Sequence, residues 1–157
     1  MRQRSQIKKG LVQIMEETEK ELAVEATLDN LVTVLGFVES EAEKAGCPKK
    51  ETKQLAVAIE ELYVNVASYA YTPATGICIV KLQTGAESDT GGWIRIFLKD
   101  HGKKFNPLLQ EPPDITLSAD DRPVGGLGIL MVKELVDRLE YMYENGENIL
   151  SVEKHWQ

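Results

Sequence analysis

The stretch that decides the fold is Trp93-Ile94-Arg95-Ile96-Phe97-Leu98-Lys99-Asp100, in which apolar residues occupy every second position. Alternate residues of a β-strand point to the same face of its sheet, so Ile94, Leu98 and Asp100 share one face. We expect this apolar face to point inward, which takes the carboxylate of Asp100 out of water and requires a hydrogen-bond donor for it. Gly102 follows, where bare backbone allows a ligand to approach closely. The alternative is that the aspartate only begins a turn at the end of the strand.

Length and composition predict one globular domain, because 157 residues with 43% hydrophobic and 27% charged side chains can bury a substantial core. The net charge of -7 argues against a direct nucleic-acid partner, which usually needs a basic face on the protein. It leaves open a basic protein partner, or a nucleotide whose charge a metal ion offsets. Cys47 and Cys78 lack the spacing of metal ligands, and two cysteines make a disulfide framework implausible.

No apolar stretch is long enough to cross a bilayer, so we expect a cytoplasmic protein without membrane contact. The run from 11 to 15 is too short for the apolar core of a signal peptide and leads directly into acidic residues. We therefore interpret residues 1–18 as a flexible N-terminal extension, or as a mis-chosen start with Met15 as the true initiator. Residues 19–157 are expected to form the single domain.

Hydrophobic spacing and turn signals predict alternating strands and helices. A proline-rich irregular stretch at 101–124 interrupts them, and loops of that length are often functional. The expected fold class is α/β (α+β): a two-layer sandwich of a mixed, mostly antiparallel sheet covered on one face by three helices. The expected elements are a strand at 22–26, a helix from 31 that stops at Gly46, a helix at 50–70, strands at 77–84 and 93–100, a helix from 125 that carries Val136 and Leu139, and a hairpin of 140–143 and 148–153 around Asn145-Gly146.

The helix at 50–70 places two polar residues at the border of the core. Its buried stripe follows Leu55, Ile59, Leu62 and Val66, so Glu61 and Asn65 lie together on the flank, one turn apart. Glu60 falls on the solvent side. A carboxylate beside an amide could act as a general base and as an oxygen ligand for Mg²⁺. The alternative is an ordinary solvated pair.

A third feature is the glycine-rich run 122–129, Arg-Pro-Val-Gly-Gly-Leu-Gly-Ile, which leads into a helix. Glycines at a helix start leave backbone N–H groups free to face an anion, and the helix dipole assists. The run is neither a P-loop nor a dinucleotide fingerprint, because it lacks the Gly-Lys-Ser/Thr and follows a loop instead of a strand. The alternative is a glycine-rich turn needed for tight packing.

Taken in order, these features resemble the N, G1 and G2 boxes of the GHKL ATPase superfamily, which includes gyrase, MutL and the histidine kinases on the Bergerat α/β sandwich. The matching patterns are Glu61-x-x-x-Asn65, Asp100-x-Gly102-x-x-Phe105 and Gly126-x-Gly128. Within the superfamily, residues 58–65, 100–107, 125–129 and 143–150 resemble the small anti-sigma-factor serine kinases of the RsbW and SpoIIAB type. The similarity covers roughly residues 20–155.

The resemblance implies a role for each matching residue, with ATP and Mg²⁺ as the cofactors. Glu61 would be the general base that accepts the proton of a substrate serine, and Asn65 would hold the Mg²⁺ that bridges the phosphates. Asp100 would accept the adenine amino group, and Gly102 would let the base lie against the backbone.

The resemblance also implies a phosphate site at the start of the third helix. Gly126 and Gly128 would cradle the phosphates, Arg122 would reach the nucleotide or the partner, and residues 106–124 would be the ATP lid. The remaining ATP-binding positions it implies are Phe105, Gly125 and Leu127. One departure is Tyr69, which stands where several relatives carry a histidine.

The implied function is a protein serine kinase that phosphorylates a STAS-domain anti-anti-sigma protein and, in an alternative complex, sequesters a sigma factor. The family suggests a homodimer. The alternative is an ATP-binding switch that changes partner affinity without kinase turnover. A histidine-kinase fragment is disfavoured, because neither His101 nor His155 lies on a helical dimerisation hairpin.

Overall fold

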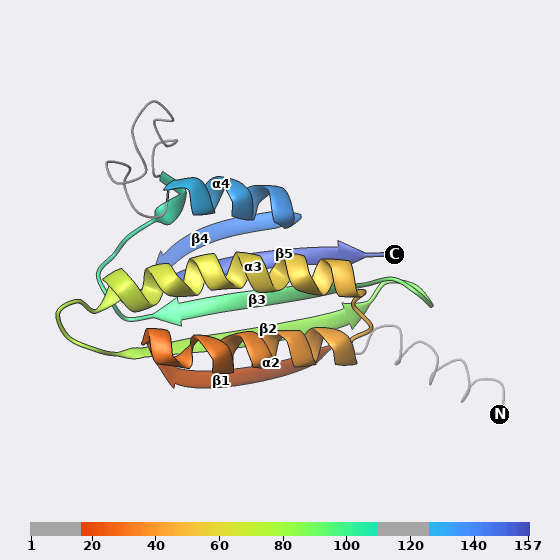
Figure 1. Ribbon diagram of the computed structural model, residues 1–157, viewed down its shortest axis with the longest axis horizontal. Helices are drawn as coiled ribbons and strands as arrows, with labels where there is room; N and C mark the ends of the chain where they lie inside the picture. Colours follow the sequence, from red (N-terminus) through yellow and green to blue (C-terminus); the bar gives the residue numbers. More distant parts are fainter. Residues whose placement is uncertain (1–16, 110–125) are drawn as a thin grey trace.

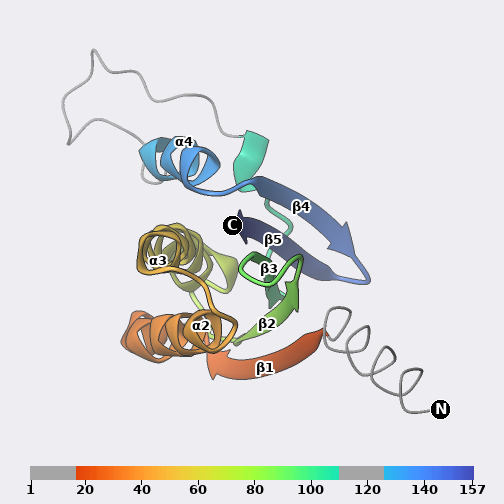
Figure 2. The same ribbon diagram turned by 90° about the vertical axis from the view of Figure 1, so that its right-hand side faces the viewer.

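The structure, a computed structural model, describes residues 17–109 and 126–157, without the side chains of residues 126 and 127. Its centre is a five-stranded sheet of order β1-β2-β3-β5-β4 in which all four pairings are antiparallel (Figure 1). The helices lie on one side of this sheet, which confirms the expected two-layer sandwich (Figure 2). The elements are β1 (Thr18–Glu25), η1 (Leu28–Asn30), α2 (Leu31–Lys44), α3 (Lys49–Asn65), η2 (Val66–Ala70), β2 (Ile77–Ala86), β3 (Gly92–Asp100), η3 (Pro107–Leu109), α4 (Gly126–Leu135), β4 (Arg138–Glu144) and β5 (Glu147–Trp156).

Strand β3 has the alternation that its sequence predicts. Ile94, Ile96 and Leu98 are buried against the helices, and Asp100 ends the same row with only 4% of its surface exposed. The register places Cys78 of β2 and Asn148 of β5 on either side of Asp100. The inward carboxylate is therefore confirmed.

Helix α2 ends at the glycine that marks its stop in the sequence. Gly46 adopts a φ of 86°, a left-handed conformation that glycine reaches without steric cost. Its N–H donates to the Glu43 carbonyl, and the N–H of Cys47 donates to the Ala42 carbonyl. This is a Schellman motif, which satisfies carbonyls at the helix end.

Helix α3 runs under the middle of the sheet and continues into a widened π turn, η2. All four residues of its expected apolar stripe are buried. Single π turns inside helices are frequent at functional sites, because they shift the side chains that follow. Together α3 and η2 account for the helix expected at 50–70.

The last helix is shorter than expected. The sequence spacing extends it through Val136 and Leu139, but α4 ends at Leu135 and Leu139 lies in β4. The N–H of Asp137 donates to the Glu153 carbonyl at 2.9 Å, so pairing with β5 replaces the next helical turn. Lys154 of β5 donates its ammonium to the Leu135 carbonyl at 2.6 Å, which caps the helix end.

Beyond α4, the expected hairpin is confirmed, with longer strands and with φ values of 52° at Asn145 and 78° at Gly146. No helix among residues 17–109 and 126–157 is long and apolar enough to cross a bilayer. The expected N-terminal extension falls almost wholly outside the described residues, and so does most of the expected lid. Both stay predictions.

A charged cluster joins β5 to the turn between β2 and β3. The two ring nitrogens of His155 lie 2.6 Å from Glu87 and 2.7 Å from Glu153, and Arg95 lies 3.0 Å from Glu153. Burial alone would lower the pKa of His155, but the hydrogen bonds to Glu153 and Glu87 outweigh it and raise that pKa. Protonated His155 therefore stabilises this end of the sheet.

This cluster gives the unfolding free energy a pH dependence of known sign. A raised folded-state pKa contributes stability that is complete below the unfolded value of about 6.5 and is lost as pH rises through the folded value. We expect the unfolding free energy to fall by up to ~1 kcal/mol over that rise, a typical size for a partly exposed ion pair. Urea unfolding of the wild-type protein and of His155→Gln at several pH values measures it. The same decline in His155→Gln would contradict the assignment to this residue.

Candidate functional site

The site is built around Asp100 at the end of β3. Its Oδ1 accepts hydrogen bonds from the Gly102 N–H and from the Asn148 side-chain amide, both at 2.9 Å. Among the described residues both donors reach the same oxygen, which leaves Oδ2 available to a ligand. A buried oxygen that can only accept selects a ligand with an N–H donor.

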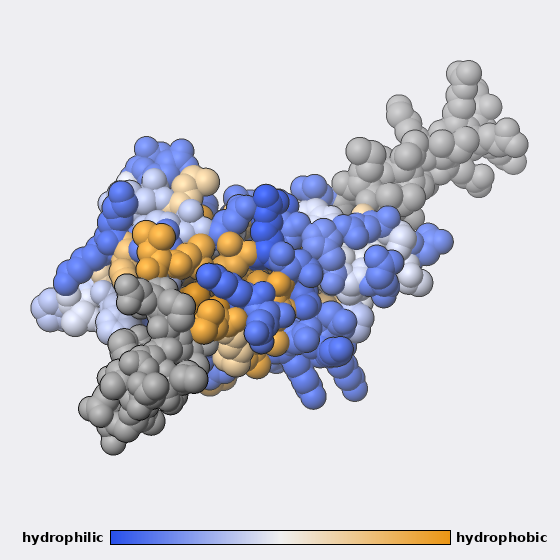
Figure 3. Space-filling model, turned by 90° about the horizontal axis from the view of Figure 1, so that it is seen from above, coloured by the Kyte–Doolittle hydropathy of each residue, from blue (hydrophilic) through white to orange (hydrophobic). Residues whose placement is uncertain are grey.

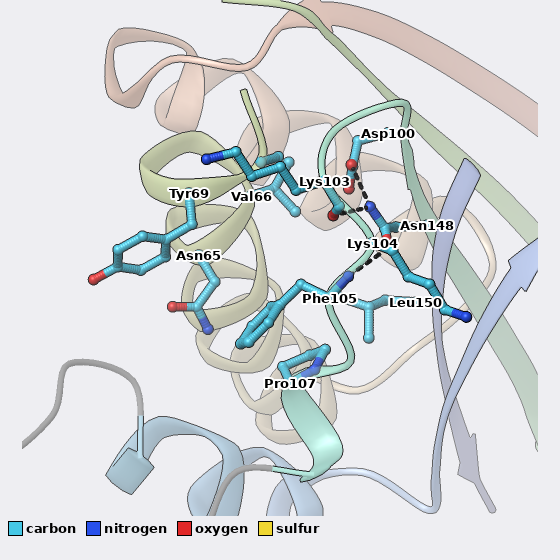
Figure 4. Close-up of a pocket in the computed structure, with 11 residues that line it drawn as sticks. Asn65, Val66, Tyr69, Asp100, Lys103, Lys104, Phe105, Pro107, Asn148 and Leu150 are labelled. Atoms are coloured by element: carbon cyan, nitrogen blue, oxygen red, sulfur yellow. Dashed lines mark hydrogen bonds between the residues drawn. The ribbon is translucent and has the colours of Figure 1, made fainter. Parts of the chain in front are cut away.

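Asn148 connects Asp100 to the loop that follows it (Figure 4). Its side-chain NH₂ also donates to the Lys103 carbonyl at 2.8 Å, and its Oδ1 accepts from the Phe105 N–H at 3.1 Å and the Tyr141 hydroxyl at 2.6 Å. The side chain is buried, and these contacts use both its donor and its acceptor groups. We did not identify Asn148 from sequence; the available signal was its place two residues after the Asn145-Gly146 turn, which sets the register opposite Asp100.

The other side of the loop is held by η2 and the residue after it. Lys103 donates its backbone N–H to the Ala70 carbonyl at 2.9 Å, and a Cβ at Gly102 would collide with that carbonyl. The Tyr71 hydroxyl accepts from the His101 N–H at 2.7 Å and donates to the Ile77 carbonyl at 2.6 Å. Close packing against η2 is therefore enough to require glycine at position 102. The expected contact of Gly102 with the adenine ring stays a prediction.

The third neighbour of Asp100 is Cys78, on β2. Burial raises the pKa of this cysteine to about 12, and the nearby Asp100 charge adds to the effect. The site therefore has a neutral thiol beside the side chain of Asp100.

A cavity of about 510 Å³ opens between η2, the loop after β3 and β5 (Figure 4). This volume is in the range of small-molecule sites, and apolar walls with a few polar groups are typical of them. Asp100 and Asn148 lie at one end of the group of side chains and Asn65 at another, with the ring of Phe105 between them. The lining residues are Asn65, Val66, Tyr69, Ala70, Asp100, Lys103, Lys104, Phe105, Pro107, Asn148 and Leu150.

Helix α3 brings Glu61 to the start of α4. Glu61 is half-buried and Glu60 is exposed, so the helical phase expected from the sequence is confirmed. A Cβ at Gly128 would collide with Glu61 Oε2, so glycine at this position leaves room for the carboxylate against α4 in its present rotamer. Glu61 is not among the cavity-lining residues; it lies one turn before Asn65, toward α4.

The structure brings together Asn65, Asp100 and Phe105 around the cavity, and Glu61 with Gly128 beside it. Tyr69, the departure from the family pattern, also lines the cavity and is 45% exposed. Gly126 begins α4, whereas Arg122, Gly125 and the side chain of Leu127 lie outside the described residues. Within the described part of the chain, no three His, Cys, Asp or Glu side chains cluster as metal ligands. The side-chain amide of Asn65, which lines the cavity, offers one oxygen of the kind that Mg²⁺ accepts when phosphates and waters complete its coordination.

Comparison with known proteins assigns this arrangement to a family. The model of the histidine kinase-like ATPase domain matches residues 24–154. The serine-protein kinases RsbW of Bacillus mycoides and Bacillus cereus are 25% and 27% identical over 142 and 143 residues, covering 87% of this chain and 86% of each relative. The serine/threonine-protein kinase BtrW of Bordetella bronchiseptica is 26% identical over 103 residues, which are 64% of this chain and 68% of the relative.

A solved structure supports the same fold. It contains the RsbU and RsbW domains of a Mycobacterium tuberculosis protein and superposes with a TM-score of 0.57 at 15% identity, over 87% of this chain and 32% of that one. The family match and the RsbW relatives confirm the resemblance drawn from the motifs.

The Asp100→Asn variant tests which ligand group the site accepts. The carbonyl oxygen of the introduced amide can keep both donors, Gly102 and Asn148, which leaves the new NH₂ group facing the ligand. If adenine binds as the family resemblance implies, this NH₂ group would oppose the adenine amino group. We expect ATP affinity to fall roughly 100-fold, the size of a lost hydrogen bond to a charged group plus an unpaired donor. Inosine triphosphate has a carbonyl in place of the amino group, so its affinity for the variant should rise relative to that of ATP.

Calorimetric titration measures both affinities, and thermal unfolding checks that the fold is kept. Glu60→Gln, which removes one exposed acid from α3, serves as the charge control and should bind ATP normally. Unchanged ATP affinity in the Asp100 variant would place the purine elsewhere.

Proposed function

Because the chain belongs to the histidine kinase-like ATPase family, we propose that it is an ATP-dependent protein serine kinase and anti-sigma regulatory factor. The observation that carries the proposal is the cavity, which has Asp100 Oδ2, able only to accept, at one end and Asn65 at another. Beside it, Glu61 of α3 lies against Gly128 in the first turn of α4. The names of the relatives RsbW and BtrW, all protein kinases, support the same activity.

In the proposed reaction, Asp100 and the loop held by Asn148 bind the adenine, which directs the triphosphate toward Asn65 and α4. Asn65 is the residue that would hold Mg²⁺, and the ion would neutralise charge on the phosphates. The serine oxygen of the substrate forms a bond to the γ-phosphorus as the bond to the bridging oxygen breaks. ADP leaves, and Glu61 takes the proton from the serine hydroxyl.

Phosphoryl transfer needs little covalent help from the protein, so positioning and charge account for most of the catalysis. The start of α4 supplies both positioning and charge, because its free N–H groups and the helix dipole stabilise bound phosphates. Gly128 allows the base to lie against this helix end. The phosphates and the proton acceptor are thereby placed on neighbouring elements.

The proposed partners are a STAS-domain anti-anti-sigma protein, whose serine is phosphorylated, and a sigma factor that the protein sequesters. Apolar side chains gather on the face seen from the α4 side (Figure 3). Leu130 and Met131 of α4 are both exposed, and exposed apolar side chains that gather on one face are typical of a surface that contacts another protein. We further propose that the protein acts as a homodimer in the cytoplasm, without binding nucleic acid directly.

Transfer from labelled ATP to a STAS-domain protein tests the kinase. We expect Glu61→Gln to lower the rate of serine labelling roughly 10²–10⁴-fold, the usual contribution of a general base, while ATP still binds. Glu60→Gln, the matched change one residue earlier on the exposed side of α3, should leave the rate within about twofold.

Two outcomes would contradict the proposal. Equal losses in both variants would mean that the assignment of the base is wrong. ATP binding without transfer by the wild-type protein would favour the nucleotide-gated switch.

Asn65→Ala tests the proposed metal ligand. Mg²⁺ should strengthen ATP binding by the wild-type protein, and this gain should be lost in the variant because the side-chain oxygen is missing. Calorimetry with and without Mg²⁺ measures the gain. Gln54→Ala removes an amide from the same helix about three turns earlier and should keep the gain. A normal Mg²⁺ response in Asn65→Ala would exclude the ligand role.

A further inference from the structure

Tyr71 does not line the cavity, but its hydroxyl holds the backbone next to Asp100. The residue follows the π turn η2, and its half-buried side chain packs against the core. The hydroxyl accepts a hydrogen bond from the His101 N–H at 2.7 Å and donates one to the Ile77 carbonyl at 2.6 Å. Because His101 directly follows Asp100, this contact lies one residue from the buried carboxylate.

The hydroxyl lies where strands β2 and β3 separate. The two strands pair as far as Cys78 and Asp100, and β2 continues to Ile77 in its pairing with β1. The next residue on each strand, Ile77 and His101, is linked through Tyr71 and not paired directly. The tyrosine therefore joins β2 to the loop at the point where β3 leaves the sheet.

The place of the tyrosine ring is set by the backbone beneath it. A Cβ at Gly76 would collide with the ring of Tyr71, so the ring packs directly on the main chain at this residue. The Gly76 carbonyl accepts a hydrogen bond from the Ala26 N–H at 2.8 Å, which ties this main chain to the end of β1. The ring is thus held against a segment that is itself bonded to the sheet.

The hydroxyl keeps its proton near neutral pH. Burial raises the pKa of Tyr71; the bond from His101 opposes this shift, and the negative charge of Asp100 adds to it. A protonated phenol can donate one hydrogen bond and accept another, which is what the Ile77 carbonyl and the His101 N–H require.

The orientation of the Asp100 carboxylate depends on the same short loop. The N–H of Gly102, which follows His101 in the chain, donates to Asp100 Oδ1 at 2.9 Å. A shift of the loop at His101 would move this donor, and the carboxylate would turn with it. Because hydrogen bonds weaken as their geometry departs from linear, this rotation would weaken a bond from a ligand to the other carboxylate oxygen.

We propose that Tyr71 is a positioning residue that sets the selectivity of the site for adenine, because it holds the backbone beside Asp100. The inference rests on the proposed function, in which the carboxylate accepts the adenine amino group. Tyr71 contacts neither the base nor the phosphates. Its hydroxyl acts through His101 and Gly102 on the orientation of the carboxylate.

Calorimetric titration of Tyr71→Phe with ATP and with inosine triphosphate tests this role. Phenylalanine keeps the ring over Gly76 and removes only the hydroxyl. We expect ATP affinity to fall roughly tenfold, the size of one weakened hydrogen bond, and the affinity for inosine triphosphate to stay within about twofold. The wild-type preference for ATP should therefore shrink about tenfold. In the serine-labelling assay the loss should appear in KM for ATP, with kcat kept within about twofold.

Tyr63→Phe is the matched control for an effect on stability alone. The Tyr63 hydroxyl donates to the Thr27 carbonyl at 2.7 Å, and Tyr63 does not line the cavity. This variant should unfold at a lower temperature and keep the preference for ATP. A partly unfolded fraction does not alter the preference in either variant, because both nucleotides bind the same folded fraction and its effect on the two affinities cancels.

The outcomes separate this inference from the proposed function. An unchanged preference for ATP in Tyr71→Phe, or an equal loss of preference in Tyr63→Phe, would overturn the inference alone. Hydrogen exchange of the His101 amide, followed by NMR, should be faster in Tyr71→Phe; an unchanged rate would also overturn it, since the amide would then have another partner. A wild-type protein that binds both nucleotides equally would overturn the proposed adenine contact together with the inference.

Discussion

The structure depends on one constraint: a carboxylate at the end of a core-facing strand row must find hydrogen-bond donors where water is excluded. Asp100 finds them in the Gly102 N–H and the Asn148 amide. Leaving such a group unsatisfied would cost several kcal/mol in the apolar interior, so the loop after β3 and the register of β5 are fixed together. Once these bonds are made, one oxygen of Asp100 has no donor among the described residues, and the side chain lines the cavity.

The same bonds set the selectivity of the site. Asn148 uses its donors on Asp100 and Lys103 and its acceptor on Phe105 and Tyr141, so it cannot rotate to offer a donor to a ligand without losing several contacts. In the proposed function, the other carboxylate oxygen of Asp100 would therefore meet the ligand as an acceptor. Because the π turn η2 packs against the same loop, the cavity wall and the carboxylate are held by one connected network.

Much of this arrangement could be predicted from the sequence because it follows from short-range periodicity. The period of two in β3 placed Asp100 inward, and the period of 3.6 in α3 separated Glu61 from Glu60. Gly46 and Asn145-Gly146 marked a helix end and a hairpin, since both require positive φ. The π turn, the early end of α4 and the role of Asn148 could not be predicted. Each depends on pairing between segments far apart in the chain: Lys103 with Ala70, Asp137 with Glu153, and Asn148 with Asp100.

The most direct measurement is a crystal structure of the protein with Mg²⁺ and a non-hydrolysable ATP analogue. The account predicts the purine amino group within hydrogen-bond distance of Asp100 Oδ2, the metal ion on Asn65 Oδ1, and the phosphates at the first turn of α4. A purine bound away from β3, or a cavity filled by side chains with the nucleotide elsewhere, would contradict it.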